Sequence, residues 1–154
     1  MNTAEDAEVT EVTFIRPMRA ADAADVATLT TQLGYPANPA DIERRFASID
    51  GHVEGALLVA EADGGRVVGW IHIVTTHLLE QDSEAEIGGL VVADGMRGRG
   101  IGQRLVEAGE KWAADHGFAA IRVRSNVVRG DAHRFYGRLG YELVKTQKNF
   151  RKTL

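Results

Sequence analysis

The sequence predicts a single α/β domain of the α+β type, with a mixed central sheet of about six to seven strands and about four helices. Three observations support this class. Short apolar runs alternate with segments whose apolar residues recur at helical spacing. Two of the strand-like runs flank a Gly-Gly turn, which is typical of an antiparallel hairpin. A later strand-like run is joined to the next through a helix, and such a crossover favours parallel strands. The expected element order is β-α-α-β-β-β-α-β-α-β-β.

The first part of the chain contains one strand and two helices. Residues 12–18 alternate β-branched, aromatic and polar side chains and form the first expected strand. The first helix begins at Asp22 as its N-cap and ends at Gly34. The second helix begins at Asn38, which is followed by proline at the first helical position. Its expected buried stripe consists of Ile42, Phe46 and Ile49.

The middle of the chain contains a hairpin and a central strand. Residues 55–62 and 67–76 are the two hairpin strands. Residues 81–85 are predicted to be a polar loop that leads into the apolar strand 87–92. A glycine-rich turn and an amphipathic helix follow, and the helix ends at Gly117.

The last part of the chain alternates strands with one short helix. Residues 118–124 are a further expected strand, and Asp131 is the expected N-cap of a helix that ends at Gly140. Residues 141–146 and 148–152 are expected to be the final strands.

Composition limits the class of protein. A chain of 154 residues with 44% hydrophobic and 26% charged residues suits one folded domain, expected over residues 12–154 after a disordered acidic tail at residues 1–11. The net charge of −4, without a basic cluster, argues against a nucleic-acid partner. The apolar runs are far shorter than the roughly 20 residues that span a bilayer. No secretory signal is visible, so a cytoplasmic location without a membrane partner is expected.

The glycine-rich turn between the central strand and its helix has the layout of an anion cradle, because backbone N–H groups and the helix dipole converge there. A P-loop would need Lys and Ser/Thr where Ile101 and Gly102 stand. A dinucleotide fingerprint would need glycine in place of Gln103. Both patterns therefore fail.

The pattern that remains, Arg97-x-x-Gly100-x-Gly102 after a strand, resembles the acyl-coenzyme A signature Q/R-x-x-G-x-G/A of the GCN5-related N-acetyltransferase (GNAT) family. A second stretch, residues 132–141, resembles the family's A-x-x-F-Y-x-x-x-G-F/Y pattern, and the element order matches from Val12 onward. The resemblance implies an enzyme that moves an acetyl group from acetyl-CoA to a primary amine by direct attack in a ternary complex.

The resemblance also implies which residues hold the coenzyme. Backbone groups of the central strand would pair with the pantetheine arm, as an added strand would. Gly88 and Gly89 in that strand are expected to form a bulge. The expected coenzyme-binding residues are Leu90, Val91, Val92, Arg97, Gly98, Arg99, Gly100, Ile101, Gly102 and Asn126.

Acetyl transfer needs a base for the ammonium group and an acid for the departing thiolate. Glu86, at the start of the central strand, is the candidate base, with Asp82 and Glu84 as alternatives. Tyr136 corresponds to the family's acid tyrosine, although its helical spacing also suits a core position.

The acceptor is less defined by the sequence. The five histidines are not clustered as metal ligands, so no metal is expected. Residues 31–36 and the acidic positions near them suggest a cationic small-molecule amine as the acceptor. Together with residues 31–36, the acidic wall of the acceptor site would be the loop residues around Asp50, His52, Asp82 and Glu84. A protein lysine or N-terminal amine is an alternative acceptor, a non-catalytic acyl-CoA-binding sensor or assembly module is an alternative function, and a homodimer is left open.

Overall fold

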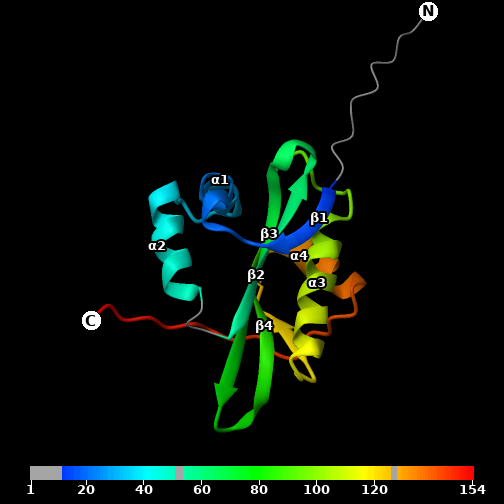
Figure 1. Cartoon of the computed structure of the whole chain (residues 1–154). Coiled ribbons are helices and arrows are strands. Elements are labelled where there is room, and N and C mark those ends of the chain that lie inside the picture. The colour runs from blue at the N-terminus through cyan, green and yellow to red at the C-terminus, as the bar shows by residue number, and fades with distance from the viewer. Residues whose placement is uncertain (1–11, 51–53, 126–127) are drawn as a thin grey trace, which may run out of the picture. The chain divides into compact units, whose positions relative to one another are not determined.

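The computed structural model describes residues 12–50, 54–125 and 128–154 (Figure 1). The strands are β1 (Val12–Pro17), β2 (Gly55–Ala62), β3 (Val67–Leu78), β4 (Gln81–Val92) and β5 (Ile121–Val123). The helices are α1 (Ala23–Leu33), α2 (Pro39–Ile49), α3 (Ile101–Asp115) and α4 (Gly130–Arg138), with short 3-10 turns η1 (Ala20–Asp22) and η2 (Asp63–Gly65). The strands form one sheet in the order β1-β2-β3-β4-β5, which confirms the α/β class. The chain forms two compact units, one up to Arg122 and one from Val123 onward, which we describe separately.

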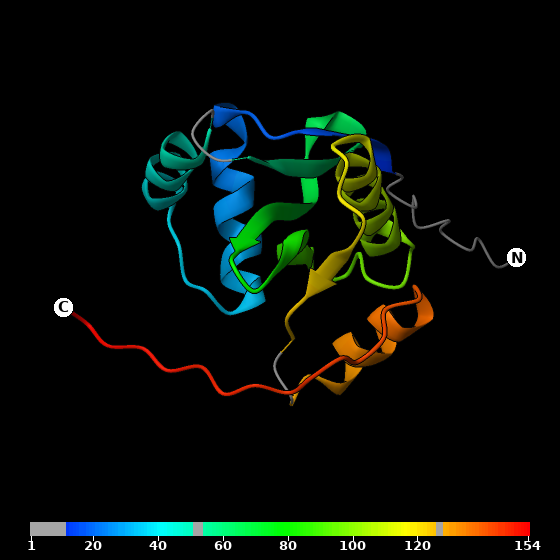
Figure 2. The same cartoon turned by 90° about the horizontal axis from the view of Figure 1, so that it is seen from below.

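In the first unit the helices lie on both faces of the sheet, with α1 and α2 on one face and α3 on the other (Figure 2). Alternate residues of β3 point to opposite faces. Ile71 and Ile73 point toward α3, where a Cβ placed on Gly109 would lie 2.7 Å from the Ile73 Cδ1 atom. Trp70 and His72 point toward α1 and α2. The sheet therefore has a tightly filled α3 face and a second face that we describe below.

A buried ion network fixes the start of α1. The Arg16 guanidinium donates two hydrogen bonds of 2.8 Å to the Asp22 carboxylate and one of 3.0 Å to Glu61 on β2. The hydrogen bond to Arg16 lowers the pKa of Asp22. Asp22 is the N-cap residue of α1 as predicted, but its side chain does not cap that helix. Instead the Asp22 side chain links α1 to Arg16 of β1, and through Arg16 to Glu61 of β2.

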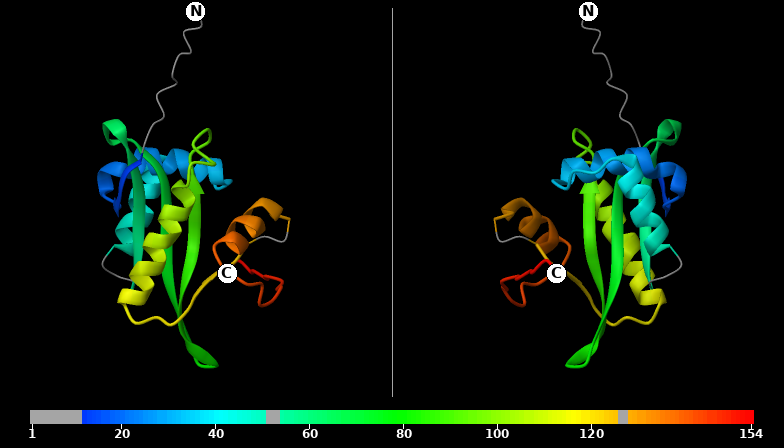
Figure 3. Two further views of the ribbon diagram at one scale, coloured as in Figure 1. Left: turned by 90° about the vertical axis from the view of Figure 1, so that its right-hand side faces the viewer. Right: turned by 90° about the vertical axis from the view of Figure 1, so that its left-hand side faces the viewer.

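The beginning of β4 differs from the prediction. Residues 81–85 were expected to be a loop, but they pair with the end of β3 in a hairpin whose tip projects beyond α1, α2 and α3 (Figure 3). Asp82 and Ser83 are exposed because this part of the hairpin has little core to cover. A polar strand of this kind lacks the apolar alternation from which strands are recognised.

The C-terminal segment also differs. The described residues 141–154 contain no helix or strand, so the two predicted final strands are wrong. The described part of the chain has five strands instead of the predicted six to seven. Strand-forming residues need a neighbouring backbone to pair with, and β-propensity alone does not supply one. Asp131 is not the N-cap of α4. The helix begins at Gly130, and its N-cap residue is Arg129. None of the described helices is long and apolar enough to cross a membrane.

Candidate active site

The glycine turn before α3 is open to an anion. Gly98 and Gly100 both have φ of +79°, in the left-handed region that glycine adopts without strain. Gly100 is the N-cap residue of α3, and in this described stretch neither a side-chain cap nor an acidic residue occupies the first turn. The Arg104 N–H donates to the Gly100 oxygen at 3.1 Å. The N–H groups of Ile101 and Gly102, which precede that bond, have no intrahelical acceptor and can bind a phosphate.

The two arginines of the turn contribute less to anion binding than the backbone of the turn does. Arg97 forms an ion pair of 3.3 Å with Asp94, and its side chain is 64% exposed. Arg99 is exposed. The Asp94 N–H donates to Gln32 of α1 at 2.9 Å, which anchors the turn to the first helix. The backbone is therefore the main anion-binding element here.

Strand β4 carries the predicted bulge. His72 pairs with Gly89 and Ile73 pairs with Ile87, so Gly88 is the extra residue in the ladder. Gly89 has a separate packing role, since a Cβ there would lie 2.7 Å from ring atoms of Trp70. The Gly-Gly pair thus bends the strand and makes room for an indole ring.

The part of β4 after the bulge is paired on one side by β3. Leu90, Val91 and Val92 lie opposite Ile71, Trp70 and Gly69. On the other side, the Ala85 N–H donates to the Ala120 oxygen at 3.2 Å, next to β5. Leu90 lies about 17 Å further along β4 than Ala85, whereas three residues of β5 extend only about 10 Å. This edge of β4 is thus beyond the reach of β5.

Glu86 is the buried member of the three candidate carboxylates. It is 8% exposed, whereas Asp82 is exposed and Glu84 forms an ion pair of 2.7 Å with Arg122. Glu86 lies opposite Val74, and paired residues share a face of the sheet. Because Val74 follows His72 by two positions, Glu86 lies on the same face as His72, toward α1 and α2.

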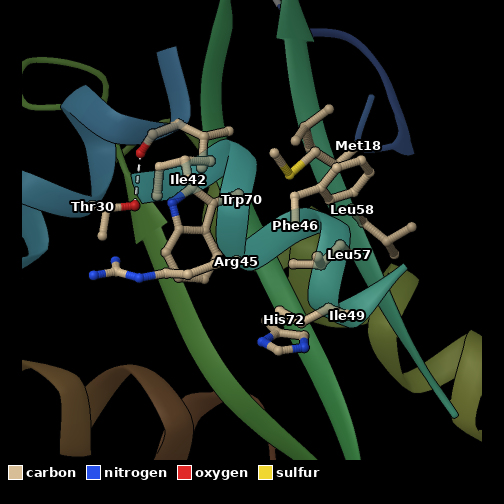
Figure 4. A pocket seen from close by; sticks show the side chains of 12 residues that line it. Met18, Thr30, Ile42, Arg45, Phe46, Ile49, Leu57, Leu58, Trp70 and His72 are labelled. Carbon is tan, nitrogen blue, oxygen red and sulfur yellow. Dashed lines mark hydrogen bonds between the residues drawn. The ribbon is translucent and has the colours of Figure 1, made fainter. Parts of the chain in front are cut away.

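A pocket of about 150 Å³ lies on this face, between α2 and the sheet (Figure 4). It is lined by Met18, Val26, Thr30, Ile42, Arg45, Phe46, Ile49, Leu57, Leu58, Val59, Trp70 and His72. Burial lowers the pKa of His72, which favours the neutral imidazole. The Trp70 Nε1 atom is buried and has no hydrogen-bond partner among the described residues. The pocket is therefore mostly apolar, with a few polar groups in its wall.

The predicted acidic wall does not line this pocket. Asp50, Asp82 and Glu84 are absent from its lining, and His52 lies outside the described residues. Across the described ranges, no group of three or more His, Asp and Glu side chains is placed to hold a metal ion. This pocket is therefore less acidic than the wall that the sequence suggested.

Tyr136 belongs to α4 in the second unit. Its ring makes edge contacts with Phe135 and Tyr141, at centroid distances of 5.1 and 5.6 Å. Burial raises the pKa of Tyr136, and the charge of Arg129 lowers it by less. The phenol is therefore protonated at neutral pH and able to donate its proton. Asn126 lies outside the described residues.

Comparison with known proteins decides the family. The family model described as "Acetyltransferase (GNAT) family" matches residues 24–141. The chain belongs to this family. The match includes both the glycine turn and α4, so the two motifs noted in the sequence lie within it.

Three similar proteins illustrate what this GNAT chain resembles. The aminoalkylphosphonate N-acetyltransferase of Salmonella typhimurium is 40% identical over 90 residues, which are 58% of this chain and 56% of that relative. The match therefore spans little more than half of the relative's length. An aminoglycoside 6'-N-acetyltransferase of Acinetobacter haemolyticus has a TM-score of 0.78 at 16% identity, covering 92% of this chain and 99% of that one. An aminoglycoside N-acetyltransferase solved in complex with CoA has a TM-score of 0.80 at 19% identity, covering 92% and 95%. These two structures show a shared GNAT fold.

Three residues of the pocket escaped prediction in this GNAT chain: Arg45, Trp70 and His72. Arg45 could have been found, because it follows Ile42 by three positions and precedes Ile49 by four, and thus lies on the same helical stripe. Trp70 and His72 looked like ordinary members of a hairpin strand. Only the packing of α2 against β3 shows that they line one cavity.

Proposed function

We propose that this protein transfers an acetyl group from acetyl-CoA to the primary amine of a small molecule, by direct attack in a ternary complex. The observation that carries the proposal is the open glycine turn at the start of α3, together with the bulged strand β4 that contains the buried Glu86. Membership of the GNAT family supports it. A cytoplasmic location and a homodimer remain predictions.

The turn suits the coenzyme's pyrophosphate, because Gly100, Ile101 and Gly102 bring backbone N–H groups to a helix N-terminus that no side chain of this described stretch caps. The free edge of β4 at residues 90–92 suits the pantetheine amides, which would pair there as a short strand. Asn126 is proposed to bond the same arm.

Two side chains would move protons. An alkylammonium group has a pKa near 10.4, so Glu86, directly or through one water, would remove the proton that blocks attack on the thioester. The departing thiolate, whose conjugate acid has a pKa near 8.5, would take a proton from the Tyr136 hydroxyl. The raised pKa of Tyr136 keeps that proton in place until the thiolate forms.

The acceptor is proposed to be a small molecule. The Salmonella relative is named for aminoalkylphosphonates and the two structural neighbours for aminoglycosides. The pocket between α2 and the sheet is of a size for a small amine and lies on the Glu86 face. A protein lysine or N-terminal amine would have to enter the same space.

Replacing Tyr136 by Phe separates the enzyme from a non-catalytic coenzyme-binding module. Release of free CoA from acetyl-CoA is measured over a panel of small amines. If the hydroxyl is the acid, kcat falls by roughly 10²–10⁴ with little change in coenzyme affinity. Tyr141→Phe is the matched control, because that ring contacts Tyr136 in the same unit.

Two results would reject the proposal. The absence of turnover with every amine, in a protein that binds CoA, would favour a sensor or assembly module. A rate within a few-fold of wild type for Tyr136→Phe, with only a lower melting temperature, would leave Tyr136 as a packing residue, because a lost buried hydrogen bond costs about 1 kcal/mol.

A further inference from the structure

The pocket between α2 and the sheet has one charged side chain in its lining, and it is a cation. Arg45 comes from α2 and is exposed, and the lining contains no Asp or Glu among the described residues. Arg45 therefore lies on the solvent-facing side of the pocket, where water screens part of its charge. Figure 4 shows Arg45 among the side chains that line the cavity. The pocket thus repels a cationic group and attracts an anionic one.

The Asn38 N–H and Arg44 lower the pKa of Asp41 most, and the charge of Arg45 lowers it by less. Among the described residues the Arg45 guanidinium takes part in no hydrogen bond or ion pair. Asp41, one turn earlier on α2, accepts hydrogen bonds from the Asn38 N–H at 3.1 Å and from Arg44 at 3.3 Å instead. The five N–H donors of the guanidinium are therefore available to a ligand.

A second donor in the same wall lacks an acceptor. The Trp70 Nε1–H is sealed from solvent without a partner in the described part of the chain. A buried N–H in this state is rare in native proteins and calls for an explanation. Thr30, also in the wall, donates its hydroxyl proton to the Val26 oxygen at 2.7 Å. A small shift of α2 or of the ring would let a ligand oxygen meet the indole N–H.

We propose that this pocket selects acceptors that carry an oxyanion, a phosphonate or a carboxylate, on a short apolar chain that ends in the primary amine. Arg45 binds the oxyanion as the specificity-determining residue, and Trp70 supplies an apolar ring and one further donor. The proposal rests on the proposed function, because it names the acceptor class of that site. It replaces the cationic acceptor that the acidic composition suggested.

The register of the sheet orients such a ligand. Trp70, His72 and Val74 follow one another on the same face of β3, about 7 Å apart, and Glu86 lies opposite Val74. Arg45 and Trp70 therefore receive the oxyanion, while the amine points along the sheet toward His72 and Glu86. A chain of a few methylene groups suits this span better than the shortest or the longest ones.

The test compares three series of amines with one to five methylene groups: ω-aminoalkylphosphonates, ω-amino carboxylic acids and α,ω-diamines. With wild-type protein, kcat/KM is expected to be roughly 10–100-fold higher for the better oxyanion series than for the diamines, the usual worth of charge-assisted hydrogen bonds. The comparison of the two anionic series distinguishes phosphonate from carboxylate. Each series should show an optimum at an intermediate length.

Arg45→Met removes the charge and keeps an unbranched apolar side chain. It is expected to raise KM for the oxyanion substrates by roughly 10–100-fold and to leave the diamines unchanged or improved. Arg44→Met is the matched control, because Arg44 is the next residue on α2, is 68% exposed and is not part of the lining. Equal effects of the two substitutions, or a preference of wild type for diamines, would overturn the proposal.

A binding measurement separates this proposal from the proposed function. Propylphosphonate has the oxyanion but no amine, so its binding by calorimetric titration does not depend on turnover. Binding to wild type that is lost in Arg45→Met but kept in Arg44→Met supports the oxyanion site even if no amine is acetylated. The opposite result would be turnover of amines without propylphosphonate binding, and no effect of Arg45→Met on KM. It would reject the oxyanion site but leave the proposed acetyltransferase activity standing.

Discussion

The glycine turn and the pocket between α2 and the sheet both belong to the first unit, but they are built from different atoms. The turn presents backbone N–H groups from neighbouring residues, and its shape follows from the left-handed φ angles of Gly98 and Gly100. The pocket presents side chains from α1, α2, β2 and β3. A site made of backbone depends on local conformation, whereas a site made of side chains depends on how distant segments pack.

The difference bears on what each region recognises. Backbone donors at a helix N-terminus bind any phosphate of suitable shape, so many related proteins can share one coenzyme site. The pocket can change its ligand through one side chain such as Arg45, while the fold stays the same. We therefore expect the coenzyme site to be shared across the family and the acceptor to vary with the individual chain.

The largest expected effect lies at Glu86, on the face of β4 that the pocket shares. Glu86→Gln should lower kcat by roughly 10²–10⁴, most strongly at low pH, where most acceptor molecules are protonated and need the base. Coenzyme affinity should stay near the wild-type value. A pH–rate profile of kcat/KM for the amine, measured together with a CoA titration, checks both statements.

Glu84→Gln is the matched control for this substitution. Glu84 is two residues away on β4 and forms an ion pair with Arg122. Two results together would identify Glu84 as the base instead. The pH–rate profile of Glu86→Gln would be parallel to that of wild type, and Glu84→Gln would lose much of its rate at low pH.

A smaller effect is expected in the turn itself. Gly100→Val should weaken CoA binding by roughly 10–100-fold, because the side chain crowds the N–H groups that meet the pyrophosphate. Gly117→Val is the control for backbone strain, since Gly117 has φ of +83° and Gly100 has +79°, and a Cβ has no neighbour within 4 Å at either position. Calorimetric titration with CoA, on variants shown by circular dichroism to be folded, measures the difference. Equal affinities for the two variants would contradict the cradle.

The smallest effect concerns stability in the pocket. Burial lowers the pKa of His72 from its ordinary 6.5, so below that pH the unfolded chain binds a proton that the folded one resists. The free energy of unfolding should therefore decrease as pH falls below about 6.5, and the His72 contribution should be constant above it. Urea unfolding at pH 7.5 and at pH 5.5 is compared for wild type and His72→Gln. The variant should lose less stability over this interval, and an identical loss would show that His72 titrates normally.

Local structure was predictable where neighbouring residues decide it. The helices α1 and α2 begin and end close to the predicted positions, because Asn38 and Gly34 are strong start and stop signals. The bulge at Gly88 was expected and is present. The polar first half of β4 was missed, since its strand form depends on pairing with β3 rather than on apolar alternation. The strands predicted within residues 141–154 are absent, because strand-forming residues alone do not supply a neighbouring strand to pair with.

The sequence by itself determined the family and the glycine turn. A short run of glycines and an arginine specifies a backbone shape, and the element order around it specifies the fold. Only the tertiary structure decided which side chains line the pocket. Arg45 and Trp70 are 25 positions apart in the chain and become neighbours of one cavity through the packing of α2 over β3. The Trp70 N–H matters there because burial removes the water that would otherwise satisfy it.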